Sequence, residues 1–363
     1  MNNSLNNTND IDINSIQKGF SHLKLINPMI GDTKKYQHIL LVEGKTDAEF
    51  YKRFLKSDVL IFYANKDAYN KEIDKIPEYM LQGRIINKQN IYVILDKDYK
   101  TEDELYEPFE DYLNKLDPSK DFDTLKNTKY NEWRLLCTNP KKYLNKFIWI
   151  TDANSLETMM LKYCDTEDKK DEFQQKLFKL HEFDYTTLDF SLNKNIIDYS
   201  IDFARKIGCI RKQNFDNGIH LKFDKTIVFD SYIIKETRYY YDYIYPEIDD
   251  SETIYNWKFD FEGWFQERCK ASYCQESEFC LNENYDEIPW YDLCQGHDLF
   301  NIIESIILQI MYLQIGKIKI EFQKIPVSPF EFSIIENYPL EYFSNSKLKK
   351  WLKENQLLSD FFS

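Results

Sequence analysis

Three short runs of apolar residues constrain the fold of this chain more than any other feature of its sequence. They are His38–Val42 (HILLV), Val59–Ala64 (VLIFYA) and Ile91–Leu95 (IYVIL), and a fourth run at 147–151 reads FIWIT. Each has the length of a strand and is apolar at nearly every position, which is typical of a parallel sheet covered on both faces. Because helix-like segments separate the runs, the pattern predicts an α/β fold in which helices flank a parallel sheet.

The segments between these runs predict the helices. One helix is expected to begin at Thr46, with Glu49 three residues later as its capping-box partner. Further helices are expected over 66–82, from Thr101 and from Ser155. The Asn-rich segment 1–34 is predicted to be a flexible arm with one short helix near 16–25.

The second half of the chain is more helical and has no Gly/Ser-rich linker, so we expect it to pack onto the sheet. Helical patterns are expected over 165–205 and 298–315, β-like runs over 210–245 and an amphipathic helix over 346–362. The predicted organisation is an arm (1–34), an α/β catalytic domain (35–165), a mixed α/β, largely helical accessory region (166–330) and a C-terminal helical tail (331–363).

The net charge of −14 argues against a protein that binds nucleic acid through an overall positive charge. Contact with a phosphate backbone then requires a local basic patch or metal ions that offset the acidic charge. The seven cysteines form no CxxC pair and fit no standard zinc pattern. No apolar run reaches the roughly 18–20 residues that cross a bilayer. The N-terminus is polar and unlike a secretory leader, so we expect a cytoplasmic protein without a membrane anchor.

Acidic residues follow two of the predicted strands. Glu43 comes directly after the first run, and Asp96 and Asp98 follow the third. In open α/β sheets, ligands bind beyond the carboxyl ends of the strands. Residues two apart in an extended segment face the same way, so Asp96 and Asp98 can share a cation. An all-oxygen ligand set favours Mg²⁺ or Mn²⁺, and Glu43 could then act as a general acid or base. An ordinary acidic turn at Glu43 and a solvated loop at 96–98 are the structural alternatives.

Two motifs carry a family resemblance. Residues 41–47 (LVEGKTD), followed by 93–98 (VILDKD), resemble the Toprim domain of topoisomerases, primases, small RNA-maturing nucleases and OLD-family nucleases. The resemblance implies that Glu43 is the catalytic acid or base and that Asp96 and Asp98 bind Mg²⁺.

A more specific resemblance is to the DUF4435 family. It rests on four motifs in order: 43–51 (EGKTDAEFY), 96–99 (DKDY), 148–160 (IWITDANSLETMM) and 296–299 (GHDL). Ser155 stands where the family motif carries an aspartate. The family includes the Toprim effector nucleases of the PARIS anti-phage systems. The resemblance therefore implies an endonuclease that cleaves host tRNA, an ABC-type ATPase partner that restrains and releases it, and a homodimer as the active form.

Further candidate site residues lie in or near these motifs. Asp47, Asp152 and Glu157 are candidates for additional metal ligands or for acids just behind them, and Lys45, Lys97 and His297 are candidates for phosphate contacts. Three of them have a clear structural alternative. Asp47 suits the dipole at a helix start. Glu157 can complete a capping box with Asn154 as N-cap. His297 can cap the helix over 298–315.

Two other functions stay open. The chain can be a DNA nuclease of the OLD type, because the residues do not distinguish DNA from RNA. It can also be an inactive Toprim-fold subunit that only senses or binds. Basic groups at 205–206, 211–212 and 141–142 and the tyrosines at 239–245 could contact nucleic acid, or could be a solvated face and an edge strand. No GxxxxGK[ST] loop occurs in the sequence, so an ATPase is expected to be a separate chain.

Overall fold

The computed structural model describes residues 23–26, 36–64, 74–86, 89–115, 135, 138–181, 191–192, 194–216, 233–238, 254–272, 287–315 and 328–362. The chain divides into two compact units. The first comprises Met1–Asp152 together with Leu340–Ser363, and the second comprises Ala153–Pro339. The unit boundaries at 152 and 339 differ from the domain boundaries expected at 165 and 330. The C-terminal segment from Leu340 accounts for part of this difference, because its partners lie in the first unit.

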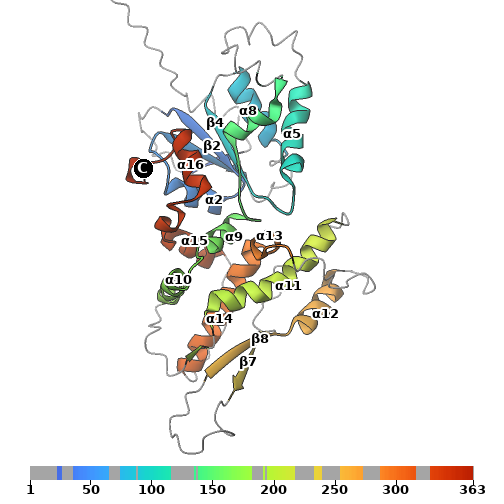
Figure 1. Cartoon of the computed structure of the whole chain (residues 1–363), viewed down its shortest axis with the longest axis vertical. Coiled ribbons are helices and arrows are strands. Elements are labelled where there is room, and N and C mark those ends of the chain that lie inside the picture. Colours follow the sequence, from blue (N-terminus) through green and yellow to red (C-terminus); the bar gives the residue numbers. More distant parts are fainter. Residues whose placement is uncertain are drawn as a thin grey trace, which may run out of the picture. The chain divides into compact units, whose positions relative to one another are not determined.

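A five-stranded sheet forms the centre of the first unit, with strand order β1-β3-β2-β4-β5. The strands are β1 (Leu23–Leu25), β2 (His38–Val42), β3 (Val59–Ala64), β4 (Ile91–Leu95) and β5 (Ile148–Ile150). β2 pairs in parallel with both β3 and β4, and β4 pairs in parallel with β5. Every residue of β2 and β4 is buried. The prediction of an α/β fold with a mostly parallel sheet flanked by helices is confirmed (Figure 1).

The edge strand β1 corrects the prediction for the N-terminal arm. Leu23–Leu25 was expected to end a short helix, but it pairs antiparallel with β3, with Leu23 opposite Ala64. An unpaired β3 would expose a row of backbone donors and acceptors at the sheet edge. Pairing with β1 supplies partners along residues 62–64. Apart from residues 23–26, the predicted arm 1–34 lies outside the described residues.

Helices cover the sheet of the first unit. They are α2 (Lys45–Lys52), α4 (Ile76–Leu81), a π-helical turn (Gln82–Ile86), α5 (Glu102–Lys115) and α8 (Pro140–Phe147). α2 packs against β2 and β3, and α4 and α8 pack against β4. The start of α2 differs from the predicted cap. Gly44 is the N-cap, and Asp47 rather than Glu49 accepts a hydrogen bond from the Gly44 N–H, at 2.7 Å. Of the helix expected over 66–82, residues 66–73 lie outside the described part of the chain.

The C-terminal segment completes the first unit. It consists of a 3-10 turn (Leu340–Phe343), helix α16 (Lys347–Glu354) and a second 3-10 turn (Asp360–Phe362). Trp351 of α16 meets Tyr92 of β4 edge-on, with 6.0 Å between ring centroids. Phe343 packs in the same way against Phe50 of α2, at 5.5 Å. The amphipathic helix expected over 346–362 is therefore shorter than predicted. Its apolar face is buried within this unit.

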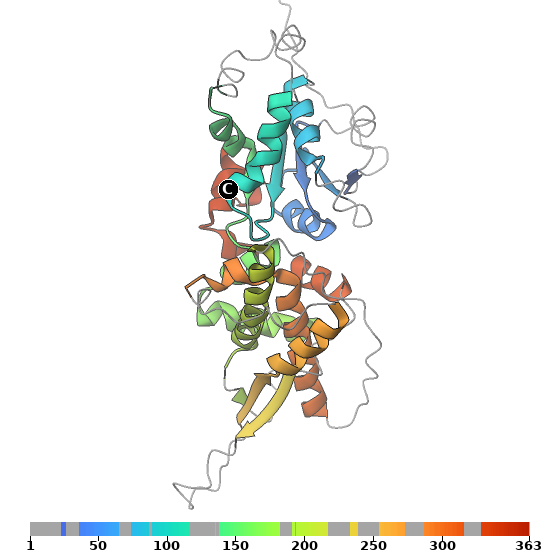
Figure 2. The ribbon, with the colours of Figure 1, turned by 90° about the vertical axis from the view of Figure 1, so that its right-hand side faces the viewer.

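The second unit is mostly helical. Its elements are α9 (Leu156–Lys162), α10 (Glu167–Leu180), β6 (Ser191–Leu192), α11 (Ile196–Asp216), β7 (Ile233–Arg238), β8 (Ile254–Phe259), α12 (Phe261–Ser272), α13 (Trp290–Leu293), α14 (Gly296–Ile315) and α15 (Ser328–Asn337). α14 packs along α11 and against α9 (Figure 2). The helix predicted over 298–315 is confirmed as α14. The β-like run expected from residue 210 is wrong for 210–216, which are the end of α11, and 217–232 lie outside the described residues.

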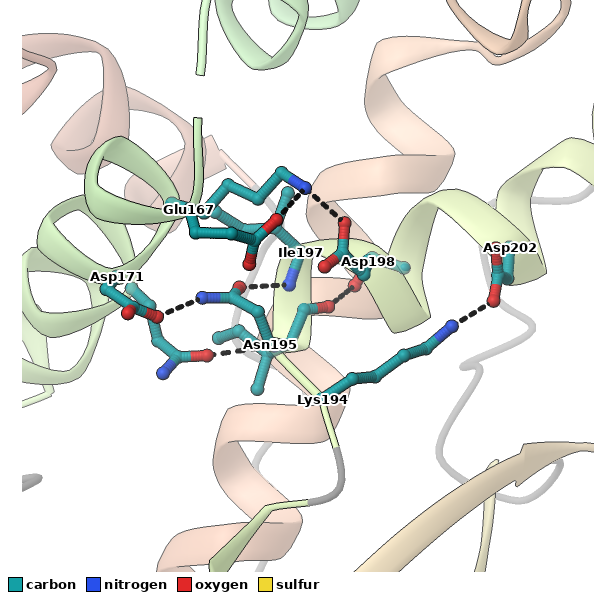
Figure 3. Close-up of polar contacts among 11 residues, drawn as sticks. Glu167, Asp171, Lys194, Asn195, Ile197, Asp198 and Asp202 are labelled. Carbon is teal, nitrogen blue, oxygen red and sulfur yellow. Dashed lines mark hydrogen bonds and ion pairs between the residues drawn. The ribbon is translucent and has the colours of Figure 1, made fainter. Parts of the chain in front are cut away.

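Polar side chains fix the start of α11 against α10 (Figure 3). The side-chain oxygen of Asn195 accepts from the Ile197 N–H at 2.9 Å, and its amide donates to Asp171 at 2.9 Å. Gln174 accepts from the Ile196 N–H at 2.8 Å. The first backbone N–H groups of a helix have no partner within the helix. These contacts supply partners, so the network acts as a helix cap.

Burial of His38, the first residue of β2, predicts that the first unit becomes less stable at acidic pH. The side chain is 8% exposed, and its Nδ1 has no hydrogen-bond partner in the described structure. Burial lowers the pKa of His38 below its ordinary value of 6.5, against an opposing effect of Asp58. The unfolded chain therefore takes up this proton at a higher pH than the folded chain does. Titration of His38 therefore leaves the free energy of unfolding unchanged well above pH 6.5 and lowers it as the pH falls through that value.

We expect the His38→Phe variant to lose this part of the acid sensitivity, because phenylalanine keeps an aromatic ring beside Tyr92 and has no titrating group. Urea unfolding at several pH values between 7.5 and 5 measures the effect. The wild-type free energy of unfolding should decrease more steeply, by at most about 1.4 kcal/mol per pH unit. Parallel pH profiles for the two proteins would show that His38 does not contribute.

Candidate active site

The parallel pairing of β2 and β4 brings Glu43 to the segment that follows β4. Leu41 is opposite Val93 in the register, and continuing this register by two residues brings Glu43 beside Leu95. The Glu43 side chain is 7% exposed, and its Oε1 accepts a hydrogen bond from the Asp96 N–H at 3.0 Å. Two of the three predicted site residues are therefore in direct contact at the carboxyl edge of the sheet.

The chain turns sharply at Asp98. Asp98 and Tyr99 have positive φ angles of 43° and 66°, and the Lys100 N–H donates to the Lys97 carbonyl oxygen at 2.8 Å. Two successive left-handed residues closed by this hydrogen bond form a type I′ turn. The prediction that Asp96 and Asp98 face the same way assumed an extended segment. The turn at Asp98 shows that this assumption is wrong. Left-handed backbone costs roughly 1–2 kcal/mol for each non-glycine residue, and such strain clusters at functional sites.

Thr151, the residue after β5, holds this turn from the other side. Its N–H donates to the Leu95 carbonyl oxygen at 3.0 Å, and its hydroxyl accepts from the Lys97 N–H at 3.2 Å. The side chain is 2% exposed. Sequence reasoning missed Thr151 as a site residue. The available indication was its place as the polar end of an otherwise apolar run, next to Asp152.

Other candidates in the first unit have different surroundings. Asp47 is buried, and its carboxylate accepts from the Gly44 N–H, so it serves the start of α2. Lys45 is exposed at the start of α2, and Lys97 is half-buried in the turn. Asp152 is half-buried directly after Thr151. Lys97 and Asp152 therefore follow β4 and β5 at the same edge as Glu43.

Glu157 belongs to the second unit, where its surroundings are those of a structural acid. Ser155, rather than Asn154 as predicted, is the N-cap of α9, and its hydroxyl donates to Glu157 Oε2 at 2.9 Å. Glu157 is 4% exposed. A Cβ added at Gly296 would lie only 2.5 Å from the Cβ of Glu157. Its carboxylate is thus packed against the first residue of α14. With Ser155 as N-cap, Glu157 is the second residue of α9 and not the third, so the capping box predicted with Asn154 is wrong. The acid instead packs at the start of α14, where a negative charge is favourable.

The GHDL motif forms the first turn of α14. His297 is exposed within this turn and is a helical residue, not a cap outside the helix. Asp298 is buried and accepts two hydrogen bonds from Arg211 of α11, at 2.7 and 2.8 Å. A bidentate guanidinium–carboxylate pair fixes orientation as well as distance. This part of the motif therefore joins α14 to α11.

Most of the basic groups considered for nucleic-acid contact have partners within the protein. Arg211 pairs with Asp298, Lys212 pairs with Asp216, and Lys141 pairs with Asp103. Arg205 donates to the Ile288 carbonyl oxygen. These contacts favour a solvated or structural role for the three basic groups over contact with nucleic acid. The tyrosines at 239–245 lie outside the described residues.

The donor chemistry at the edge of the first unit's sheet fits a hard divalent cation. Carboxylates and a hydroxyl are oxygen donors of the kind that Mg²⁺ prefers, and Mg²⁺ is commonly held by one or two carboxylates with water and substrate phosphate. Within the described ranges, no three His, Cys, Asp or Glu side chains gather as a metal-binding group. A site on Asp96 and Asp98 with Glu43 as acid or base needs only two carboxylate ligands, so the residues present are compatible with it.

Comparisons of the chain with protein-family models, with curated proteins and with solved structures returned no match. The resemblance to Toprim and DUF4435 proteins therefore rests on the sequence motifs. In the part of the chain that the structure describes, no helix has the length and apolar character to span a bilayer.

Proposed function

We propose that the chain is a Toprim-type, metal-dependent endonuclease. In this proposal, Glu43 is the general acid or base, and Asp96 and Asp98 hold Mg²⁺ or Mn²⁺. One observation carries the proposal. The Glu43 carboxylate and the Asp96 backbone are hydrogen-bonded at the carboxyl edge of a parallel sheet, although 53 residues separate them in sequence. That is the edge at which open α/β sheets bind their ligands.

The roles of the residues follow from this arrangement. The Asp96 N–H fixes one oxygen of the Glu43 carboxylate, so the group has a defined orientation for giving a proton to, or taking one from, a phosphodiester oxygen. The left-handed turn at 98–99 sets the direction of the Asp98 side chain. In this proposal, the Lys97 ammonium contacts a phosphate of the nucleic-acid backbone. When bound, the metal ion would stabilise negative charge on the scissile phosphate.

The substrate and partner in this proposal come from the DUF4435 resemblance. The chain would cleave host tRNA in the cytoplasm as the toxic effector of an anti-phage system, in the manner of AriB of PARIS. An ABC-type ATPase (AriA-like) would restrain and release it, and the released effector would act as a homodimer. The net charge of −14 makes dependence on a bound cation or on a local basic group reasonable for a nucleic-acid enzyme.

The test measures cleavage and its dependence on metal. Purified chain is incubated separately with tRNA, other RNA and plasmid DNA, with Mg²⁺, with EDTA, and with EDTA followed by excess Mg²⁺ or Mn²⁺. We expect discrete cuts in tRNA that EDTA abolishes and added metal restores. The same cut positions should appear as new RNA ends in cells that express the chain.

Two results would favour the alternatives. Metal-dependent cuts in plasmid DNA, with tRNA intact, would favour a nuclease of the OLD type. An absence of cleavage together with an absence of Mg²⁺ and Mn²⁺ binding in calorimetry would contradict the proposal and favour a subunit that only senses or binds.

A further inference from the structure

We infer that Thr151 is a positioning residue of the proposed nuclease site, whose hydroxyl holds the turn that carries Asp96 and Asp98. The inference rests on the proposed function. It adds a residue for which the motifs suggested no role, and it predicts how that residue affects the metal dependence of the reaction.

The backbone explains why this position needs an acceptor. The residues of β4 take part in the sheet up to Leu95, whose carbonyl oxygen accepts from the Thr151 N–H at 3.0 Å. Beyond β4 the chain leaves the strand ladder, and the next two N–H groups need other partners. Glu43 accepts the hydrogen bond of the Asp96 N–H, and the Thr151 hydroxyl accepts that of the Lys97 N–H, at 3.0 and 3.2 Å.

The two strands that flank β4 thus lead to the acceptors for consecutive amides of one short segment. β2 leads to the acceptor for Asp96, and β5 leads to the acceptor for Lys97. The left-handed residues Asp98 and Tyr99 follow at once. A strained turn persists only where its surroundings determine it strongly. The Thr151 side chain is 2% exposed, so water has little access to replace its hydroxyl as the acceptor.

Loss of the Thr151 hydroxyl should change the distance between the Asp96 and Asp98 carboxylates. If Lys97 loses its acceptor, the turn can relax, and the Asp98 carboxylate moves relative to Asp96 while Glu43 keeps its contact. A displacement of about 1 Å in an active site can reduce the rate by about 100-fold. A change in the spacing of two metal ligands should appear first as a weaker response to metal.

The experiment compares Thr151→Val with Thr151→Ser in the full chain. Valine has nearly the shape of threonine but no hydroxyl, and serine keeps the hydroxyl. One measurement is amide hydrogen exchange of the peptide that covers 96–100. The other is the Mg²⁺ concentration that gives half-maximal cleavage of tRNA. We expect several-fold faster exchange at 96–100 and a roughly 3- to 10-fold higher half-maximal Mg²⁺ concentration for the valine variant. The serine variant should behave like the wild type.

Each other outcome has a distinct meaning. Unchanged exchange at 96–100 in the valine variant would overturn the inference, whatever the activity. Faster exchange throughout the first unit, with the same Mg²⁺ dependence, would overturn it too and leave Thr151 a role in general stability. Failure of the wild type to cleave any nucleic acid would overturn the proposed function, and the role in catalysis would fall with it. The exchange data would identify that case, because they do not require activity.

Discussion

The Glu43→Gln variant is expected to lose about 10²- to 10⁴-fold in tRNA cleavage, the contribution typical of a general acid or base. Glutamine has nearly the size of glutamate and keeps a side-chain oxygen that can accept from the Asp96 N–H. It cannot exchange a proton with a phosphodiester oxygen. The change therefore removes the proton chemistry and leaves the neighbouring hydrogen bond in place. Single-turnover cleavage of tRNA at saturating Mg²⁺ measures the loss.

A matched control separates chemistry from charge. Glu107 is exposed on α5 in the same unit, so Glu107→Gln removes the same single charge away from the carboxyl edge of the sheet. It should cleave tRNA at the wild-type rate. Both variants should unfold at the wild-type temperature within about 2 °C, because neither alters apolar packing. Wild-type cleavage by the Glu43→Gln protein would remove Glu43 from the proposed mechanism.

The Gly208→Ala variant is expected to destabilise the second unit, against the prediction from helix propensity. Gly208 lies inside α11, where alanine is intrinsically more favourable than glycine by about 1 kcal/mol. A Cβ at this position, however, would lie 2.7 Å from the carbonyl carbon of Leu293 and 3.2 Å from the nitrogen of Cys294. Both atoms are backbone atoms at the end of α13, so no rotation of a side chain can relieve the contact.

Packing should therefore outweigh propensity. Forcing an extra methyl group into a filled contact typically costs about 1–3 kcal/mol. For a unit of this size, each kcal/mol lowers the melting temperature by about 2–4 °C. Differential scanning calorimetry of the full chain measures the shift. Lys206→Ala, on the exposed face of the same helix, is the control and should change the melting temperature little. A Gly208→Ala protein at least as stable as the wild type would show that α11 and α13 can separate at this contact without cost.

Local patterns in the sequence were sufficient for the three central strands of the first unit's sheet, but not for its edge strand β1, which was predicted to end a helix. The runs at 38–42, 59–64 and 91–95 are β2, β3 and β4 with the predicted bounds. Such runs can be read locally because a strand buried on both faces must be apolar at almost every position. Helix starts were less certain, since the choice among neighbouring polar residues depends on which side chain reaches a free N–H. Asp47 serves α2 and Ser155 caps α9, one or two residues from the predicted partners.

The candidate site was likewise predictable from the sequence only in part. The acids at the ends of β2 and β4 could be read from the sequence, because parallel strands present their carboxyl ends at one edge. The order of the strands could not, and it is the strand order that joins Glu43 to Asp96 across 53 residues and Thr151 to Lys97 across 54. The left-handed turn at Asp98 was equally hidden, because neither Asp98 nor Tyr99 is a glycine.

The sequence by itself determined the three central strands of the sheet, the class of fold and the candidate acids, because each depends on residues that are near one another in the chain. Only the tertiary structure decided that the segment from Leu340 completes the first unit, that Glu157 packs against the start of α14, and that Thr151 reaches the Lys97 amide. These outcomes depend on which distant surfaces come together. That choice is made by the summed packing and hydrogen bonding of the whole unit, which no short segment contains.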